Sequence, residues 1–269
     1  MRGKQRFAKT AGPGKGHIGL GRALSKLGFC SRSQAFELIR TGRVRLQGVV
    51  SKNPEAGVRL GKDRIEVDGV EVKREEKIYW MLNKPRGLVT TAEDEQGRET
   101  VYGGLPEGLP WMAPVGRLDK TSEGLLFFTN DSEWAARITA PESHLDKIYH
   151  VQIATVAGES PLTALINGVR PQDGELLSAK RAARIRTGEK NSWIEIVLDE
   201  GKNRQIRRML EAFDVNVLRL VRVAIGPVEL GQLEKGKARE LTADEKQQMD
   251  RALSDAVLRP KRTRYRKYE

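Results

Sequence analysis

Residues 115–131, VGRLDKTSEGLLFFTND, carry the pattern that decides the fold of the surrounding domain. Gly116 favours a turn, and the apolar run 125–128 that follows Gly124 is typical of a buried strand. Asp119 is therefore expected on a glycine-flanked loop at the edge of that strand, where a side chain is held rigidly and still faces a cleft. For a single Asp, however, a turn residue bonded to its own backbone is the commoner case, and spacing alone does not separate the two.

The segment GRLDKTSEGLLFFTND resembles the catalytic signature of the pseudouridine synthases, in particular the ribosomal-RNA branch typified by the RsuA enzyme. The resemblance implies that Asp119 is the catalytic carboxylate. Ser122 stands where most members have Thr, and Phe127 and Phe128 stand where Leu is usual, so a hydroxyl and an apolar strand are both kept. The resemblance extends over roughly residues 21–245.

The charge of the chain indicates a polyanionic partner. The 269 residues carry a formal charge of +12, with a pI near 9.8. The excess lies in residues 1–70 and 259–269, whereas residues 71–258 are slightly acidic. This distribution is typical of a protein that binds nucleic acid.

The composition also argues against several kinds of site. A single cysteine, Cys30, excludes an intramolecular disulfide and a cysteine-based metal cluster, and the three histidines have no close ligand spacing. We therefore expect no metal and no cofactor. No apolar run approaches the ~18 residues that a membrane span needs, so we expect a cytoplasmic protein with no membrane contact.

The N-terminal part is expected to be a small RNA-binding module. Residues 1–20 are predicted to be a flexible basic tail. In residues 21–70, two short helices, the second with a capping box of Ser31 and Gln34, precede small strands. The stretch GRALSKLGFCSRSQAFELIRTGRVRLQG resembles the S4 RNA-binding domain, which implies that basic residues of the second helix and the following turn face RNA: Lys26, Arg32, Arg40 and Arg43.

The rest of the chain is divided into a linker (71–78), a catalytic domain (79–245) and a C-terminal helix with a basic tail (246–269). Strands outnumber helices and do not alternate regularly with them, which indicates an α+β fold. The family resemblance implies a mixed, largely antiparallel central sheet with flanking helices, in two halves with the active cleft between them. Strands are expected near 176–187 and 215–223, and Asn203 is expected to cap a helix that ends near Phe213. The LNKPRGLVTT segment also resembles the family, in which the Lys-Pro turn and the following strand shape the floor of the active site, but we expect the Asn-Lys-Pro turn to have no chemical role.

A buried carboxylate needs a nearby cation to stay ionised, and the segment EGKNRQIRRM offers candidates. The resemblance places the partner of Asp119 at Arg207. At helical spacing Arg204 and Arg208 share a face that 207 does not. We therefore expect Arg207 to point inward, with the remaining cations toward RNA: Lys202, Arg204 and Arg208. The alternative is that all four form one phosphate-binding face.

Three further residues are assigned by the resemblance. Tyr149, in a K-x-Y pattern, would stack on the target uracil and relay a proton, although its alternation with Val151 and Ile153 also suits a core tyrosine. Ile225 would pack against the other side of the base, as any core isoleucine could. Arg117 would fill the gap left in the RNA by the flipped base.

The expected function is isomerisation of a specific uridine in ribosomal RNA, with large-subunit (23S) RNA slightly preferred to small-subunit (16S) RNA. The glycosidic bond is cut and the uracil is re-attached through C5, by attack of Asp119 on C1′ or C6 or by proton abstraction; the sequence does not choose among these. The partner is ribosomal RNA or a ribosomal subunit precursor, and a monomer is expected. The alternatives are a non-catalytic RNA-binding or ribosome-assembly factor, and a glycosidase for free nucleosides, which would need a second carboxylate to activate water.

Overall fold

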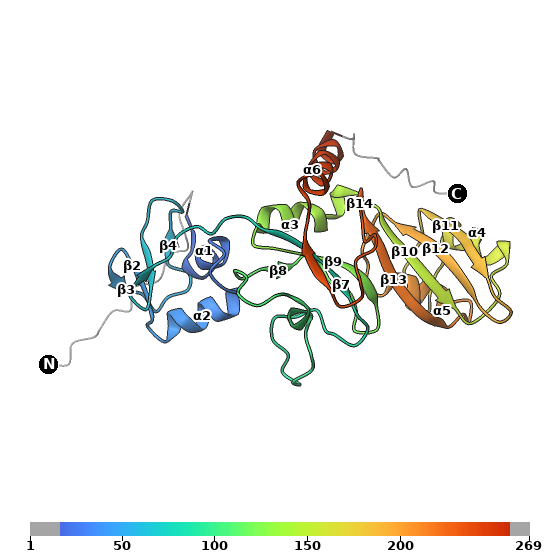
Figure 1. Cartoon of the computed structure of the whole chain (residues 1–269), viewed down its shortest axis with the longest axis horizontal. Coiled ribbons are helices and arrows are strands. Elements are labelled where there is room, and N and C mark those ends of the chain that lie inside the picture. Colours follow the sequence, from blue (N-terminus) through green and yellow to red (C-terminus); the bar gives the residue numbers. More distant parts are fainter. Residues whose placement is uncertain (1–16, 259–269) are drawn as a thin grey trace. The chain divides into compact units, whose positions relative to one another are not determined.

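The computed structural model describes residues 17–258, which form two compact units (Figure 1). The first comprises 17–78 together with 108–113, and the second comprises 79–107 and 114–258. In the described part of the chain, no helix is both long enough and apolar enough to cross a membrane.

The first unit packs two helices on small sheets. Its elements are β1 (Ile18–Gly19), α1 (Leu20–Lys26), α2 (Arg32–Arg40), β2 (Val44–Leu46), β3 (Val49–Val50), β4 (Gly57–Val58), β5 (Ile65–Val67) and β6 (Val70–Glu71). The antiparallel order is β3-β2-β5-β6, and β1 pairs with β4. The predicted capping box at the start of α2 is confirmed, because Ser31 and Gln34 each bond the other's backbone N–H. Its core includes Leu24, Ile39 and Val44, all fully buried.

The second unit is built on one long mixed sheet. Its strands are β7 (Tyr79–Lys84), β8 (Ala113–Pro114), β9 (Glu123–Thr129), β10 (Lys147–Ile153), β11 (Arg181–Thr187), β12 (Ser192–Leu198), β13 (Val217–Ile225), β14 (Val228–Glu229) and β15 (Ala238–Glu240). The strand order is β11-β12-β10-β13-β9-β7-β15, with β14 beside β13 and β8 beside β9. The main-path pairs are antiparallel except β13 with β9, which run parallel at Val221–Glu123 and Arg222–Gly124. The expected α+β fold with a largely antiparallel sheet is confirmed.

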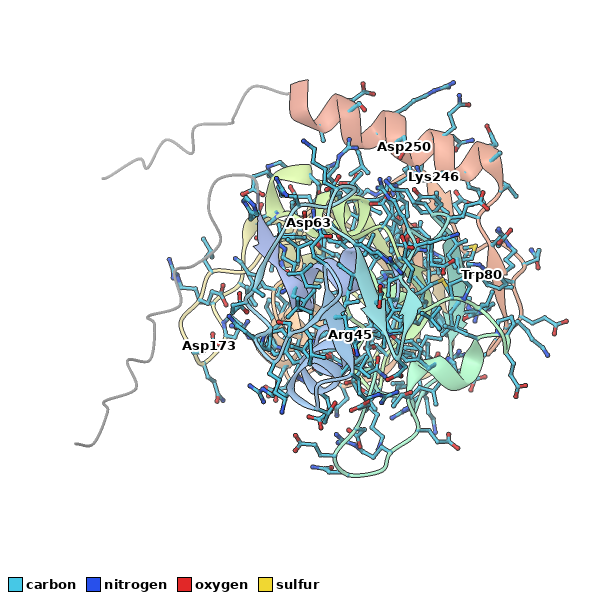
Figure 2. All side chains as sticks on the ribbon, turned by 90° about the vertical axis from the view of Figure 1, so that its left-hand side faces the viewer. Arg45, Asp63, Trp80, Asp173, Lys246 and Asp250 are labelled. Carbon is cyan, nitrogen blue, oxygen red and sulfur yellow. The ribbon has the colours of Figure 1, made fainter. Side chains whose placement is uncertain are left out.

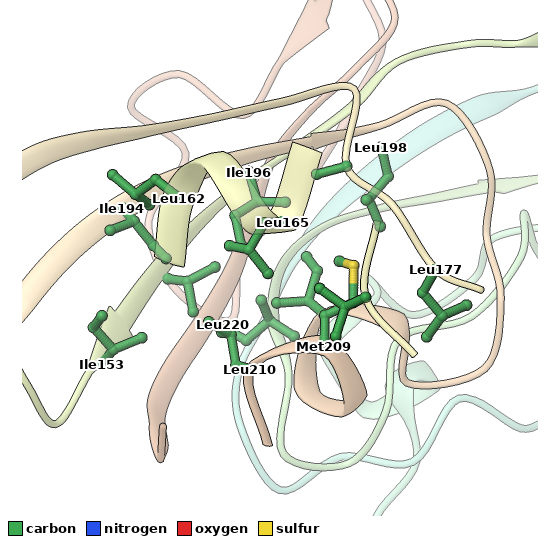
Figure 3. Close-up of a cluster of buried hydrophobic side chains, with 14 of the residues drawn as sticks. Ile153, Leu162, Leu165, Leu177, Ile194, Ile196, Leu198, Met209, Leu210 and Leu220 are labelled. Carbon is green, nitrogen blue, oxygen red and sulfur yellow. The ribbon is translucent and has the colours of Figure 1, made fainter. Parts of the chain in front are cut away.

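The short parallel pairing divides the sheet into two halves with separate cores. Helices α4 (Glu159–Asn167) and α5 (Gln205–Glu211) cover one core with β10, β12 and β13, as Figure 3 shows around Leu165, Ile196 and Met209. The other core lies under α3 (Ser132–Thr139) and α6 (Ala243–Leu258). Two 3-10 turns, η1 (Val101–Gly104) and η2 (Pro141–Ser143), complete the unit. The two half-sheets meet at β9 and β13, which is where the active cleft is expected.

Several boundaries differ from the expected ones. Ile18 pairs with Val58 and Leu20 is fully buried, so ordered structure begins before residue 21. The helix after residue 240 begins at Ala243, and its Met249 and Leu253 belong to the core of the second unit, because they continue its apolar face. On the same side of α6, Lys246 pairs with Asp250 one turn away (Figure 2), and Asp250 accepts from the indole N–H of Trp134. The remainder of both expected basic tails lies outside the described residues.

Three other expectations in the second unit need correction. The strand expected at 176–187 begins only at Arg181, because residues before it bond the end of α4: Ala179 N–H donates to Leu165 O and Leu177 bridges to Val169. The helix expected to be capped by Asn203 starts at Gln205 after Arg204, whose φ of 47° is left-handed. The following strand runs to Ile225 instead of stopping at Val223.

Candidate active site

Asp119 lies on the loop between β8 and β9, and this loop is held from two sides. Its backbone oxygen accepts from the Ser122 N–H at 2.9 Å, which closes the turn before β9. The Thr90 hydroxyl donates to the Leu118 carbonyl at 2.7 Å and accepts from the Leu118 N–H at 3.3 Å. Among residues 17–258, nothing bonds the Asp119 carboxylate itself. The loop is thus rigid while its carboxylate is left available.

The buried side chain of Lys84 also holds the Asp119 loop in place. This lysine, at the end of β7, is 0% exposed. Its ammonium donates to the carbonyls of Pro85 (3.1 Å), Asp119 (3.1 Å) and Ser122 (2.8 Å). Burial lowers the pKa of Lys84 to about 8, and the negative charges of Glu123 and Asp119 oppose that shift. The Asn-Lys-Pro turn, expected to have no chemical role, therefore contains the residue that shapes the loop of the candidate catalytic carboxylate.

Asp119 opens onto a cavity of about 600 Å³ within the second unit. Its walls come from the Asp119 loop, from β10 and β13, and from the segment that leads into α5. Together with Asp119, the site residues predicted from the sequence that line it are Arg117, Tyr149, Lys202, Arg204 and Ile225. Residues far apart in the chain thus converge on one carboxylate.

One wall of the cavity is formed by two antiparallel strands. In the register of β10 and β13, Lys147 faces Ile225 and Tyr149 faces Arg222, with a bulge between Ile148 and Tyr149. Tyr149 lines the cavity and also packs against the core of this half-sheet. Its position is therefore compatible both with a tyrosine that stacks on the base and with a core tyrosine. Ile225 is 2% exposed and also lines the cavity.

Arg207 is placed near Asp119 but not in an ion pair with it. Its guanidinium donates to the Thr121 carbonyl at 3.2 Å, while its buried Nε has no partner among the described residues. No contact within 4.0 Å joins it to the Asp119 carboxylate in the part of the chain described. Burial and the charge of Arg204 lower the pKa of Arg207, and the charge of Asp119 acts in the opposite sense. The expected inward direction of this side chain agrees with the structure; the expected direct pairing is not formed.

The remaining predicted cations differ in their surroundings. Arg117 and Arg204 are exposed at the cavity. Lys202 lies between Glu175 (3.4 Å) and Glu200 (3.3 Å). The Arg208 side chain is only 18% exposed and is bound by Asp173 and by Glu175, so it is not the open phosphate ligand that helical spacing suggested.

The basic residues predicted for the first unit are mostly on its surface. Arg32 and Arg40 are exposed at the two ends of α2, and Lys26 lies in the last turn of α1. Arg43 instead donates two hydrogen bonds to Asp68, at 3.0 and 2.5 Å. Hydrogen bonding to Asp68 raises the pKa of Arg43.

Sequence reasoning missed three cations at the site: Lys84, Lys147 and Arg222. Lys147 is the first residue of the K-x-Y pattern and Lys84 lies in the LNKPRGLVTT segment, so the signal was present in motifs that were used for other residues. Arg222 lies on an alternating apolar strand in which an arginine is out of place, a departure that itself marks a site. Within residues 17–258, no group of three His, Cys, Asp or Glu side chains is placed to hold a metal ion.

Comparison with known proteins agrees with this geometry. Residues 78–212 match the family model described as RNA pseudouridylate synthase, and residues 20–65 match the S4 domain. The chain is 37% identical over 241 residues to the ribosomal large subunit pseudouridine synthase B of Bacillus subtilis, covering 88% of this chain and 96% of the relative. A relative of the same name from Yersinia pestis is 36% identical over 219 residues, covering 78% of this chain and 68% of the relative. A crystal structure of a pseudouridylate synthase aligns with a TM-score of 0.61 at 30% identity, covering 86% of this chain and 99% of the other.

Proposed function

Since the chain belongs to the RNA pseudouridylate synthase family, we propose that it isomerises one uridine of ribosomal RNA, and that the RNA is that of the large subunit. The enzyme class follows from the family, whereas the choice of RNA rests on a relative that is matched over 96% of its length and whose name specifies that subunit. The S4 domain supports an RNA substrate, because such modules bind structured RNA largely through phosphate contacts. We further propose that the enzyme acts as a monomer in the cytoplasm, where it would meet ribosomal RNA.

The observation that carries the proposal is an available carboxylate at the wall of a cavity large enough for a flipped nucleotide. A base that undergoes chemistry has to leave its helix and enter a pocket. The Asp119 carboxylate has no partner in residues 17–258, and Tyr149 and Ile225 line the same cavity. We assign Asp119 to the sugar and Tyr149 and Ile225 to the two faces of the uracil.

The exposed cations complete the assignment. Arg117, one residue before Leu118 on the same loop, would fill the space that the flipped base vacates. Arg204 and Lys202 would hold the phosphates beside the target at the mouth of the cavity. Arg32 and Arg40 would bind RNA from the first unit, because they are exposed on one short helix.

The test is pseudouridine mapping on ribosomal RNA from a strain that lacks the gene, before and after incubation with the purified protein. We expect one new pseudouridine in 23S RNA. Asp119→Ala is expected to form none while keeping its RNA affinity, because phosphate contacts carry most of the binding. A new pseudouridine only in 16S RNA would overturn the subunit assignment. Turnover by Asp119→Ala would overturn the catalytic assignment, and tight binding without any turnover would favour an assembly factor.

A further inference from the structure

The cavity wall holds two cations that the assignment above leaves unused. Lys147 and Arg222 lie on neighbouring strands and alternate with Tyr149 and Ile225, the two residues assigned to the base. Arg222 is 6% exposed; its Nε donates to the Leu125 carbonyl at 2.8 Å, and its buried Nη2 has no partner among residues 17–258. An unpaired buried donor is costly unless a ligand or water uses it.

No carboxylate of the described residues forms an ion pair with either side chain. Asp146 and Asp199 lie near Lys147 and favour its charged form, although Lys180 also pairs with Asp146 at 2.7 Å. Cations nevertheless outnumber carboxylates among the side chains that line the cavity. Burying cations without counter-ions is unfavourable, so such a wall is suited to a ligand that brings negative charge.

Burial separates Arg222 from the cations that suit phosphates, and Lys147 is intermediate. Arg117 and Arg204 are exposed at the cavity, whereas Arg222 is enclosed in the wall beside Ile225. A phosphate group could reach Arg222 only if the RNA backbone itself entered the pocket together with the base. The ring of a flipped nucleotide enters the pocket in any case.

We propose that Lys147 and Arg222 form an anion site for the pyrimidine ring, which stabilises the uracil anion released when the glycosidic bond breaks. The inference rests on the proposed function. In that step the C1′–N1 bond breaks and its electron pair stays on uracil, spread over N1, O2 and O4. The electron-deficient sugar is captured by the Asp119 carboxylate or gives it a proton. After the ring rotates, a C5–C1′ bond forms as the Asp119 bond is released or its proton returned; C5 loses its proton and N1 gains one, so composition is unchanged.

Donors that meet charge as it develops accelerate a reaction more than they improve binding of the ground state. The site therefore predicts a preference for a pyrimidine anion over the neutral ring even in the absence of RNA. It also predicts that removing Lys147 or Arg222 lowers the reaction rate by a smaller factor when the leaving ring itself stabilises the negative charge.

The first experiment needs no RNA. Binding of barbiturate, a pyrimidine ionised at neutral pH, is compared with binding of neutral uracil by ligand-observed NMR. The full-length wild type is expected to bind barbiturate at least ~10-fold more tightly than uracil, and Lys147→Met to lose that preference. Lys190→Met, a change at an exposed lysine in the β11–β12 turn, is the matched control and is expected to keep it. Equal affinity of the wild type for the two rings would overturn the proposal.

The second experiment measures single-turnover rates at saturating enzyme, on a transcript that contains the mapped uridine. Lys147→Met is expected to lose about 100-fold in rate with little change in RNA affinity. With 5-fluorouridine at the target, whose ring leaves more readily as an anion, the loss in nucleoside consumption is expected to fall below about 10-fold. An equal loss on both transcripts, or weaker binding with a flatter salt dependence at an unchanged rate, would contradict an anion site and indicate a phosphate contact.

Arg222→Lys keeps a cation but loses the fork that reaches Leu125. It is expected to retain more activity than Arg222→Gln. The melting temperatures of both variants show whether they fold. If neither folds, the result for Lys147→Met alone tests the anion site. Turnover by the wild type measures the proposed function separately. An inactive wild type that prefers barbiturate would reject the substrate assignment and keep the anion site.

Discussion

The ammonium of Lys84 donates a hydrogen bond to the backbone carbonyl of Asp119, 3.1 Å away. Two more carbonyls, those of Pro85 and Ser122, accept from the same group. One buried cation thus joins the end of β7 to both ends of the turn that presents Asp119. The carboxylate is positioned through its own main chain, and its side chain has no hydrogen-bond partner among residues 17–258.

Lys84→Met should therefore remove activity without removing RNA binding. The thioether fills similar space but cannot donate, so the carbonyls of Pro85 and Ser122 lose this buried donor, whereas the Asp119 carbonyl keeps the Ser122 N–H. Leaving such groups unsatisfied costs about 1–3 kcal/mol each, partly offset because no charge is buried any longer. We expect a lower urea midpoint, a single-turnover rate reduced by about 100-fold and RNA affinity within about twofold. A variant with wild-type rate would show that the Asp119 loop does not depend on this lysine.

Deprotonation of Lys84 with rising pH should lower the reaction rate but raise the free energy of unfolding. Burial lowers its pKa from 10.5 to about 8. Above that pH the neutral amine has two N–H donors for three carbonyls, so the rate should fall. Between about 8 and 10.5 the unfolded chain holds more protons than the folded one, so the Lys84 contribution to the free energy of unfolding rises with pH, and it is constant below this window.

The measurement compares wild type with Lys84→Met at pH 7 and pH 9.5, by urea unfolding and by single-turnover rate. The difference between the two proteins removes the titration of other groups. A difference in unfolding free energy that does not change with pH would mean that Lys84 keeps its ordinary pKa in the folded protein.

Gly124 should not tolerate a side chain, because the two half-sheets meet there. Its φ is +100°, and a Cβ would lie 2.2 Å from the Arg222 carbonyl oxygen. Gly87 has a similar φ of +108° with nothing within 4 Å, so it provides a matched control for backbone strain alone. We expect Gly87→Ala to cost about 1–2 kcal/mol and Gly124→Ala clearly more, measured by urea unfolding. Equal costs would mean that the parallel contact between β9 and β13 can open without loss.

The family motifs explain what the sequence could predict. Asp119, Tyr149 and Ile225 are assigned by the family resemblance and all line the cavity, whereas strand alternation alone suits a core tyrosine at 149 equally well. The contacts of Lys84 could not be predicted from local patterns, because two of its three acceptors lie 35 and 38 residues along the chain. The partners of Arg208 could not be predicted either, because its two carboxylates lie 35 and 33 residues away in the chain. Helical spacing concerns only neighbours on the same helix.

Arg207 and Arg208 are adjacent, yet they should respond differently to alanine. Arg207 is half-buried beside the Asp119 loop and bonds the Thr121 carbonyl, whereas Arg208 is held by carboxylates away from the Asp119 loop. Removing Arg207 takes away a positive charge near the Asp119 carboxylate and the donor that bonds the Thr121 carbonyl of the same loop. We expect Arg207→Ala to lose at least about 100-fold in single-turnover rate.

Arg208→Ala should change neither the rate nor the salt dependence of RNA binding appreciably, because its charge is already neutralised by Asp173 and Glu175. Arg207→Lys should recover only part of the loss, since an ammonium does not reproduce the planar donor that reaches Thr121. The measurement is the single-turnover rate against pH at saturating enzyme, together with affinity against salt, for the three variants. If Arg207→Ala and Arg208→Ala gave the same profile, with the chemical rate unchanged and only the affinity reduced, α5 would be a phosphate-binding helix and Asp119 would not depend on Arg207.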